Sequence, residues 1–206
     1  MNGFVTLATQ PAEAATLRKV HLRETEDGAH ALELFLASVE RKAFRIAQIA
    51  LRHEADALDV VQDAMLQLSA RYAMKPAAEW KPLFYRILEN RIRDVQRRRT
   101  VRNRVMALTP WRSASDEGEP ADPIAEAADS GPSPVAQLES DEILKALERA
   151  LTTLPNRQRQ AFLLRNFEGM DVAQTAQAMK CSAGSVKTHY FRAVQALRLK
   201  LGDLRT

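Results

Sequence analysis

The spacing of apolar residues near the carboxyl end constrains the fold of this 206-residue chain most strongly. One run of apolar residues recurs at spacings of four and three: Val172, Ala176 and Met179. After an interruption at Lys180-Cys181-Ser182, a second run recurs at spacings of four, three and four: Val186, Tyr190, Ala193 and Leu197. Such spacings place side chains on one face of an α-helix, so two short helices must meet at a tight corner, with Ser182 as N-cap of the second. Residues 154–201 are therefore expected to form a helix-turn-helix.

The outer face of the second of these helices carries groups that suit a DNA groove. With the apolar stripe turned inward, five residues remain on the outside: Ser185, Lys187, Thr188, Phe191 and Arg192. Lysine and arginine pair with phosphates or guanine acceptors, serine and threonine donate to either, and a phenylalanine ring contacts a thymine methyl group. The competing interpretation is an ordinary helical hairpin with a solvated basic face.

A longer motif favours the DNA-reading interpretation. Its parts are Leu154-Pro155-Asn156-Arg157-Gln158-Arg159, Phe162-Leu163-Leu164-Arg165, Phe167-Glu168-Gly169-Met170, Cys181-Ser182, Gly184-Ser185-Val186-Lys187 and Arg192-Ala193. This run closely resembles the promoter-reading C-terminal domain of bacterial sigma factors, specifically the small extracytoplasmic-function group. The resemblance implies that the five outer residues read the −35 promoter element. Lys180 departs from the family, which commonly has a small or turn-forming residue there, and implies either an ordinary backbone conformation or mild strain.

Helical periodicity also runs through the first half of the chain. Three stripes are visible: Leu32, Leu36, Val39, Ala43, Ile46 and Ala50; Leu58, Val61, Met65 and Leu68; and Phe84, Leu88, Ile92 and Val95. No window alternates with a period of two, so strands are not expected. Three to four helices with short connections predict a compact bundle over residues 29–106.

The remaining segments divide the chain into domains. Residues 107–137 are rich in proline and glycine, and residues 113–137 hold six acids and no base, which is typical of a flexible acidic linker. Residues 1–28 are weakly patterned, with Pro11 and Gly28 as breakers, and are expected to be a flexible or partly helical extension. Residues 138–206 form the second bundle, whose first apolar stripe is Leu144, Leu147, Leu151 and Leu154. The expected fold class is all-α, with two small helical bundles joined by the linker and the helix-turn-helix in the second.

The first bundle resembles the other conserved part of the same family, the domain that grips RNA polymerase and melts promoter DNA. The similarity lies in Asp56-Ala57-Leu58-Asp59-Val60-Val61-Gln62-Asp63-Ala64-Met65 and in Phe84-Tyr85-Arg86-Ile87-Leu88-Glu89-Asn90 with Asp94 and Arg97-Arg98-Arg99. It implies that four residues on and beside an exposed helix flank bind RNA polymerase core: Asp59, Val60, Gln62 and Asp63. It also assigns five residues to the −10 element: Tyr85, Asn90, Asp94, Arg97 and Arg98. The family's usual tryptophan is Leu83 here, with Trp80 one helical turn earlier.

The charge distribution agrees with a nucleic-acid partner. The formal net charge is +4, and residues 86–104 contain eight arginines against only Glu89 and Asp94. A basic amphipathic helix can also lie on an anionic membrane or simply keep a surface solvated. Because the apolar stripe of this helix is needed to hold the bundle, nucleic acid is the preferred partner.

The titratable residues show no pattern of a catalytic or metal site. The four histidines are scattered, Cys181 is the single cysteine and is expected to be a small buried side chain, and no glycine-rich phosphate loop is present. No apolar run is long enough to span a membrane, and the first ten residues lack the features of a signal peptide. We therefore expect no enzymatic activity, metal, cofactor or small-molecule substrate, and a cytoplasmic location.

Together these features predict a sigma factor whose partners are RNA polymerase core and promoter DNA, and they leave an anti-sigma factor open as a further partner. Two other functions compete with this prediction. One is a helix-turn-helix transcription regulator that does not join the polymerase, and the other is a structural helical adaptor. Binding to core polymerase separates the first function from both others, and binding to DNA separates the second from the third.

Overall fold

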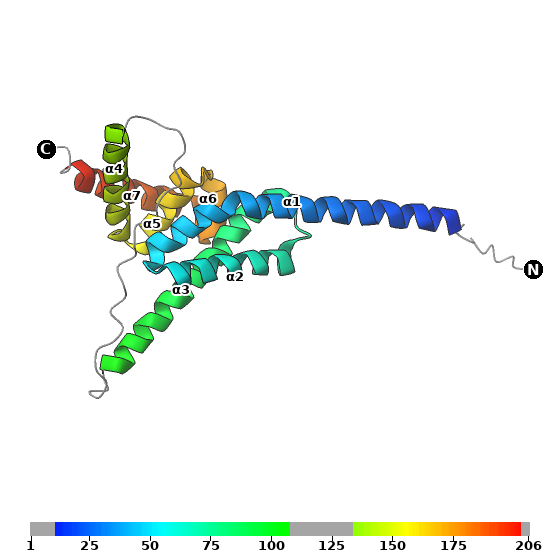
Figure 1. Ribbon diagram of the computed structural model, residues 1–206, viewed down its shortest axis with the longest axis horizontal. Helices are drawn as coiled ribbons and strands as arrows, with labels where there is room; N and C mark the ends of the chain where they lie inside the picture. The colour runs from blue at the N-terminus through cyan, green and yellow to red at the C-terminus, as the bar shows by residue number, and fades with distance from the viewer. Residues whose placement is uncertain (1–10, 108–133, 203–206) are drawn as a thin grey trace, which may run out of the picture.

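The computed structural model describes residues 11–107 and 134–202, and the side chains within residues 27–104 and 142–202. Every element that it describes is helical, as Figure 1 shows. The elements are α1 (Pro11–Leu51), α2 (Glu54–Tyr72), α3 (Ala77–Ala107), α4 (Pro134–Thr152), α5 (Asn156–Phe162), a π-helical turn η1 (Leu163–Phe167), α6 (Val172–Met179) and α7 (Ala183–Gly202). The all-α fold class is confirmed.

The first helical unit consists of α1, α2 and α3, which pack against one another. Where α1 meets α2, four completely buried alanines lie in the core: Ala43, Ala47, Ala57 and Ala64. The distance between two packed helices depends on the side chains between them, so methyl groups allow the two backbones to approach closely. Phe84 of α3 is also completely buried, with its ring edge-on to Phe35 at a centroid distance of 6.3 Å.

Trp80 closes the same core at the start of α3. Its indole is buried, and its Nε1 donates a hydrogen bond to the carbonyl oxygen of Tyr72, the last residue of α2, at 3.2 Å. The indole nitrogen thereby finds the partner that a buried tryptophan needs. The displaced tryptophan noted in the sequence is thus a core residue that ties α3 to α2.

Polar side chains of α3 hold the carboxyl end of α1. Arg99 donates from Nη1 to the carbonyl of Leu51 at 2.8 Å and also pairs with Asp56, while Gln96 donates to the carbonyl of Ala50 at 3.0 Å. The last carbonyl groups of a helix have no partner within the helix. These bonds therefore satisfy the end of α1 and fix how α3 crosses it.

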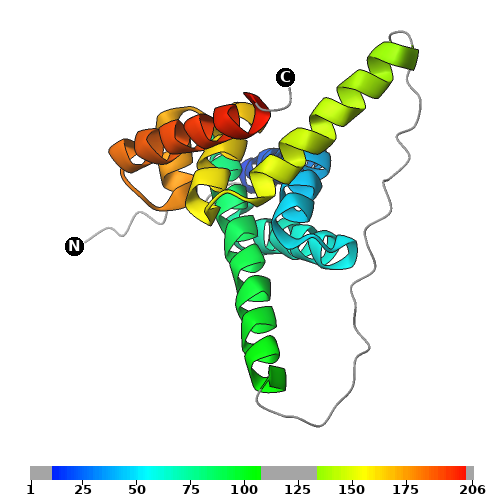
Figure 2. The same ribbon diagram turned by 90° about the vertical axis from the view of Figure 1, so that its left-hand side faces the viewer.

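The second helical unit consists of α4 to α7, with α7 in contact with α4, α5 and α6. Its core includes Leu151, Leu154, Leu163, Val186 and Leu197. The prediction that Leu144 belongs to this core is wrong, because its side chain is 50% exposed. One end of α4 extends beyond the other helices of the unit (Figure 2).

Two segment boundaries differ from those expected. Gly28 does not end a helix, because α1 continues through it from Pro11. In addition, α4 starts at Pro134, inside the segment 107–137 that was expected to be a linker. A single glycine costs a helix only about 1 kcal/mol relative to alanine, which a long helix tolerates. The rest of the expected linker, with its acidic residues, and the first ten residues lie outside the described residues.

The two units are in contact with each other. α3 packs against α6, and α1 packs against α4 (Figure 2). Two bundles joined only through a linker, as expected from the sequence, would not make these contacts. They decide which side chains of α3 remain accessible.

Candidate nucleic-acid interface

Hydrogen bonds at both helix starts build the corner between α6 and α7. Asp171 and Gln174 form a capping box at the start of α6, in which the Gln174 N–H donates to Asp171 Oδ1 at 2.7 Å and the Asp171 N–H donates to Gln174 Oε1 at 3.1 Å. Ser182 caps α7, as predicted, because its Oγ accepts from the Ser185 N–H at 3.1 Å. Both helices therefore start at positions set by their own sequence.

Lys180 ends α6 in a left-handed conformation. Its φ is 50° and its ψ is 53°, so the strained of the two predicted conformations is observed. This conformation costs a residue with a β-carbon roughly 1–2 kcal/mol. It turns the chain so that the Cys181 N–H donates to the carbonyl of Ala176 at 3.1 Å. The Cys181 side chain packs against the core but is only half-buried.

The inner and outer faces of α7 follow the predicted pattern. Val186, Ala193 and Leu197 are buried. Four of the five residues predicted for the outer face are exposed: Lys187, Thr188, Phe191 and Arg192. Ser185, the fifth, is half-buried, and its hydroxyl lies 2.9 Å from that of Ser182. The outer face of α7 thus offers two cations, a hydroxyl and an aromatic ring, and contact of these groups with DNA stays a prediction.

Tyr190 fixes the rotation of α7 about its own axis. Its ring stacks on Phe162 with a centroid distance of 6.3 Å, and its hydroxyl donates to Asn166 Oδ1 at 3.2 Å. The guanidinium of Arg165 lies 5.9 Å from the centre of the same ring. These contacts hold the Tyr190 side chain at its face and at its hydroxyl end. The outer residues of α7 are consequently presented in one orientation.

Of the residues of the basic helix α3 that are predicted to contact DNA, some are exposed and others are partly or fully buried. Asn90, Arg97 and Arg98 are exposed, and Asp94 is half-buried, 3.6 Å from Arg97. Spacings of four and three place Asn90, Asp94 and Arg97 on one face. Arg93, which the sequence did not single out, lies beside them and donates to Asn90 Oδ1 at 3.0 Å.

Tyr85 does not belong to this exposed face. Only 2% of its surface is accessible, so the prediction of an accessible DNA contact is wrong in this structure. Burial, together with the nearby charge of Glu168, raises the pKa of its phenol above the ordinary value. Glu168 belongs to the second unit, which covers this part of α3. Sequence periodicity could not reveal the covering, because it arises between segments far apart in the chain.

The predicted polymerase-binding flank of α2 needs one correction. Asp59, Gln62 and Asp63 are exposed, but Val60 is only 3% exposed, and Leu58 is 47% exposed. The buried face of α2 is instead made by Ala57, Val60, Val61, Ala64 and Leu68. Since two of these are alanines packed closely under α1, a pattern weighted toward large apolar residues gives the wrong rotation of the helix.

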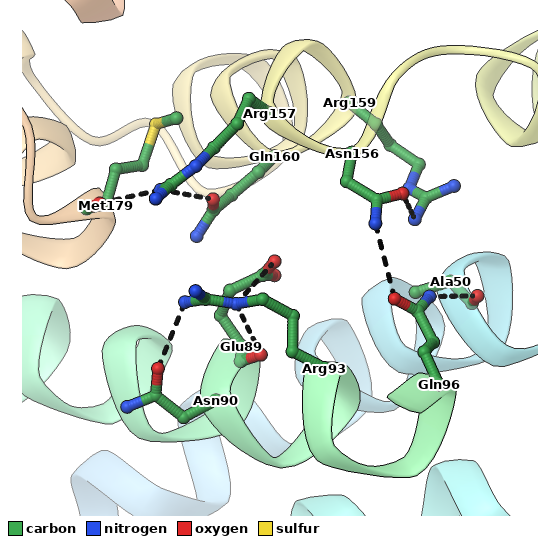
Figure 3. Close-up of polar contacts among 10 residues, drawn as sticks. All are labelled: Ala50, Glu89, Asn90, Arg93, Gln96, Asn156, Arg157, Arg159, Gln160 and Met179. Atoms are coloured by element: carbon green, nitrogen blue, oxygen red, sulfur yellow. Dashed lines mark hydrogen bonds and ion pairs between the residues drawn. The ribbon is translucent and has the colours of Figure 1, made fainter. Parts of the chain in front are cut away.

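The contact between the units brings together residues that the sequence did not identify as a group. Lys81 of α3 donates to the carbonyl oxygen of Glu168 at 2.6 Å and lies 3.5 Å from its carboxylate. Asn156 of α5 donates to Gln96 of α3 at 3.3 Å (Figure 3). One available signal was the pair Arg157 and Arg159 at the start of α5, where the helix dipole disfavours cations unless they have other partners.

Glu89 points from α3 toward α5 at the centre of this contact (Figure 3). Burial raises the pKa of its carboxyl to about 7, against the lowering effects of Arg93, Arg159 and Arg157. Burial also lowers the pKa of Arg159, whose guanidinium donates to Asn156 Oδ1 at 2.9 Å. Glu89 lies 3.7 Å from Arg93 on its own helix, whereas its side chain and that of Arg159 are not among the ion pairs of the described residues. Burial of both groups is therefore only partly offset by charge pairing.

Within residues 11–107 and 134–202, no group of three or more His, Cys, Asp or Glu side chains is arranged to hold a metal ion. Among the helices that the structure describes, none has the length and apolar character that crossing a membrane requires.

Comparison with known sequences identifies similar proteins. Residues 144–197 match the family described as Sigma-70, region 4. The chain is 30% identical over 171 residues to the ECF RNA polymerase sigma factor SigM of Mycobacterium tuberculosis, a match that covers 81% of this chain and 74% of that protein. It is also 35% identical over 72 residues to the RNA polymerase sigma-H factor of Pseudomonas aeruginosa, covering 35% of this chain and 37% of that one.

Two solved structures are similar in fold. The sigma factor RpoE, in complex with the anti-sigma factor NepR from Bartonella quintana, matches 82% of this chain and 96% of its own, with a TM-score of 0.60 and 21% identity. CnrH, in complex with the cytosolic domain of CnrY, matches 85% of this chain and 95% of its own, with a TM-score of 0.53 and 19% identity.

Proposed function

The chain belongs to the extracytoplasmic-function group of bacterial RNA polymerase sigma factors, and we propose that its helical units divide promoter recognition between them. It is a sigma factor, which binds RNA polymerase core and directs transcription initiation at particular promoters. This assignment sets aside a regulator that does not join the polymerase. In the proposed division the second unit reads the −35 element through α7, the first unit holds the melted −10 element through α3, and α2 binds core polymerase.

The observation that carries the −35 assignment is the outer face of α7. Lys187, Thr188, Phe191 and Arg192 are exposed along one helix whose opposite face is anchored in the core. An arginine at such a position can bind guanine through two hydrogen bonds, and a lysine can neutralise a phosphate. Ser185 lies nearer the corner, where its hydroxyl can serve a phosphate at the edge of the groove.

The −10 assignment is supported by the mixture of amide and cationic groups on α3. Capture of a single strand requires a cationic track for the phosphates and planar groups for the bases. Arg93, Arg97 and Arg98 supply the track, and Asn90 supplies an amide beside it. Asp94 is 3.6 Å from Arg97 and orients that guanidinium.

The polymerase contact is assigned to Asp59, Gln62 and Asp63 on the exposed side of α2. Leu58 and Leu66 are exposed on the same helix and add apolar area to a surface that α1 and α3 leave uncovered. Val60 is not part of this surface, because it lies in the core of the first unit. An acidic and apolar helix face suits a basic partner helix.

Every step assigned to the chain is a binding step, so it acts without catalytic activity of its own. It works in the cytoplasm, where polymerase and promoter meet. An anti-sigma factor is a further partner, because the RpoE of similar fold forms a complex with the anti-sigma factor NepR. Copurification of such a partner with the tagged chain, and loss of transcription when the partner is added back, would test this last point.

Binding to core polymerase without DNA tests the division of roles. Wild-type protein should form a stable complex with core polymerase freed of sigma factor and then start transcription at a specific promoter. The variant Asp59→Lys/Gln62→Ala should lose the complex while its circular dichroism and thermal unfolding stay unchanged, because exposed substitutions shift stability by only about 0.5 kcal/mol or less.

A matched control separates the position of these changes from their chemistry. Glu40→Lys/Gln195→Ala makes the same two kinds of change at exposed positions on α1 and α7, and it should bind core polymerase normally. If the α2 variant bound as tightly as wild type, the polymerase contact would have to lie elsewhere on the chain.

A further inference from the structure

Arg93 and Asn90 contact each other on the exposed side of α3. We propose that Arg93 is a positioning residue for −10 recognition: it turns the Asn90 side chain so that the NH₂ group faces the DNA and selects guanine over adenine at one position of the element. The proposal rests on the function proposed above, because it requires that α3 reads the −10 element.

The direction of the Asn90 carboxamide follows from the chemistry of its partner. Arg93 Nη2 donates to Asn90 Oδ1 at 3.0 Å. A guanidinium group has only hydrogen-bond donors, so the carboxamide turns its oxygen toward Arg93 and its nitrogen away from it. Figure 3 shows this arrangement, with the nitrogen of Asn90 on the side opposite to Arg93. Because Asn90 is exposed, this nitrogen is the accessible end of the side chain.

Arg93 is itself held by the preceding turn of α3. Its Nε donates to the carbonyl oxygen of Glu89 at 3.4 Å and lies 3.7 Å from the Glu89 carboxylate. The bond to the carbonyl oxygen does not depend on whether Glu89 is ionised. The Arg93 side chain is 46% exposed, compared with 78% for Arg97 one turn later, so Arg93 is the more restrained of these two arginines. Its guanidinium therefore approaches Asn90 from a fixed position.

The same arrangement recurs one helical turn later. Asp94 lies four residues after Asn90 on the same face and is 3.6 Å from Arg97. Each of the two polar side chains on this face thus has an arginine partner three residues later in the chain. Side chains at this spacing are neighbours on a helix surface. The repeated pairing indicates that arginines orient the polar groups of this face in addition to attracting phosphates.

A carboxamide with a fixed direction distinguishes the two purines. Guanine offers two acceptors side by side, N7 and O6, whereas adenine offers the acceptor N7 beside the donor N6. An unrestrained asparagine binds adenine with both ends of its carboxamide, since its oxygen accepts from N6 and its nitrogen donates to N7. Asn90 presents its nitrogen instead of its oxygen to the DNA, so guanine meets its acceptors while the donor of adenine meets another donor.

Turning the Asn90 carboxamide over is unfavourable while Arg93 is beside it. The NH₂ group would then face the guanidinium, so that two donors would oppose each other and a charge-assisted hydrogen bond would be lost. Without Arg93, either direction is open to the carboxamide, including the one that suits adenine. Arg93 consequently affects the choice of base through Asn90.

Selection from a randomised promoter library measures the choice of base directly. Core polymerase reconstituted with the full-length chain is mixed with DNA fragments randomised across both promoter elements, and the bound fragments are sequenced. The position that Asn90 reads is the −10 position whose preference disappears in Asn90→Ala. There the wild-type complex should retain guanine about tenfold more often than adenine, as expected for a well-placed contact with a base edge.

Variants of Arg93 separate positioning from the loss of a charge. Arg93→Met, which has no donor, should lower the guanine-to-adenine ratio about tenfold at that position, whereas Arg93→Lys, whose ammonium group also only donates, should keep guanine preferred. Arg102→Met removes the same charge from another exposed position of α3 and should leave the ratio unchanged. In the Asn90→Ala background, Arg93→Met should not alter the ratio.

The mobility of the Asn90 carboxamide in the free chain provides a second test, without polymerase or DNA. In protein with ¹⁵N-labelled asparagine, the side-chain signal that is missing from Asn90→Ala belongs to Asn90 Nδ2. Its order parameter should fall in Arg93→Met, because the carboxamide is released, and should stay at the wild-type value in Arg102→Met.

The proposal is overturned if the wild-type complex prefers adenine or neither purine at the Asn90 position, or if Arg93→Met keeps the wild-type ratio. It is also overturned if the carboxamide is equally mobile in wild type and Arg93→Met. A wild-type complex that enriches no −10 sequence at all would instead contradict the proposed function, while the mobility measurement would still show whether Arg93 holds Asn90.

Discussion

The sequence predicts DNA contacts on the outer face of α7 and on one side of α3, but the structure exposes these two sets of residues to different extents. On α7, Phe191 is 62% exposed and its neighbours are accessible, because everything that positions them lies within their own unit. On α3, Tyr85 is 2% exposed, because a segment more than seventy residues later in the chain covers it. A helix face defined by local packing can be derived from apolar spacing, whereas a face defined by contact between units cannot.

The largest expected effect contrasts the two aromatic residues directly. Tyr85→Ala should destabilise the protein by about 3–5 kcal/mol, because it empties a buried site, while Phe191→Ala should change stability by about 0.5 kcal/mol or less. Urea unfolding followed by circular dichroism measures both values. Equal stability of the two variants would mean that the covering of α3 does not persist in solution.

A second effect sharpens the assignment of α7. Arg192→Ala should weaken binding to a −35 duplex by about 1–3 kcal/mol in a manner that depends on sequence, whereas Lys187→Ala should weaken binding evenly across sequences. Fluorescence anisotropy with the cognate duplex and with single-base variants measures the difference. The distinction between base and phosphate contacts fails if both variants lose the same affinity on every duplex.

Neighbouring arginines of α3 supply a smaller contrast. Arg99 is committed to the end of α1, so Arg99→Ala should lower stability by about 1 kcal/mol. Arg97→Ala/Arg98→Ala should leave stability nearly unchanged and reduce the slope of log affinity against log salt for −10 single strands by about 1–2, because fewer counterions are released. A salt titration with each variant provides the measurement. An unaltered slope in the double variant would make these two arginines a solubilising surface only.

The smallest expected effect concerns the turn that presents α7. Lys180→Gly should raise stability by about 0.5–1 kcal/mol, since glycine adopts the left-handed conformation without strain, and Lys180→Ala should not. The thermal midpoint should rise by a few degrees in the glycine variant and should not rise in the alanine variant. Equal midpoints would show that the lysine conformation is not strained.

Much of the fold could be predicted because apolar residues recur at helical spacing over long continuous segments of the chain. The apolar residues of α3 and α7, the helical character of every described element and the cap at Ser182 all follow from the sequence. The rotation of α2 could not be derived in the same way. Leu58 is a stronger apolar signal than Ala57 or Ala64, but the alanines are buried, because only they let α1 approach closely.

The candidate site was predicted in parts for the same reason. Lys81, Glu89 and Arg159 are separately unremarkable residues on two helices, and the sequence contains nothing that pairs them. These residues form a group only where α3 packs against the second unit, which removes water from their side chains. Burial of charge between distant segments is a property of tertiary structure, and one sequence without its fold does not display it.

The uninterrupted course of α1 has a consequence for how its two halves become helical. At about 1.5 Å per residue its 41 residues extend about 60 Å, and Figure 1 shows its earlier half reaching beyond the other helices. An isolated segment has to form a helical nucleus first, which carries a statistical weight of only about 10⁻³. The earlier half of α1 avoids this step, because it grows as an extension of a half that is already folded against α2 and α3. Its helicity is inherited from the bundle, and separating the halves near Gly28 would leave the bundle intact while depriving the outer segment of its nucleus.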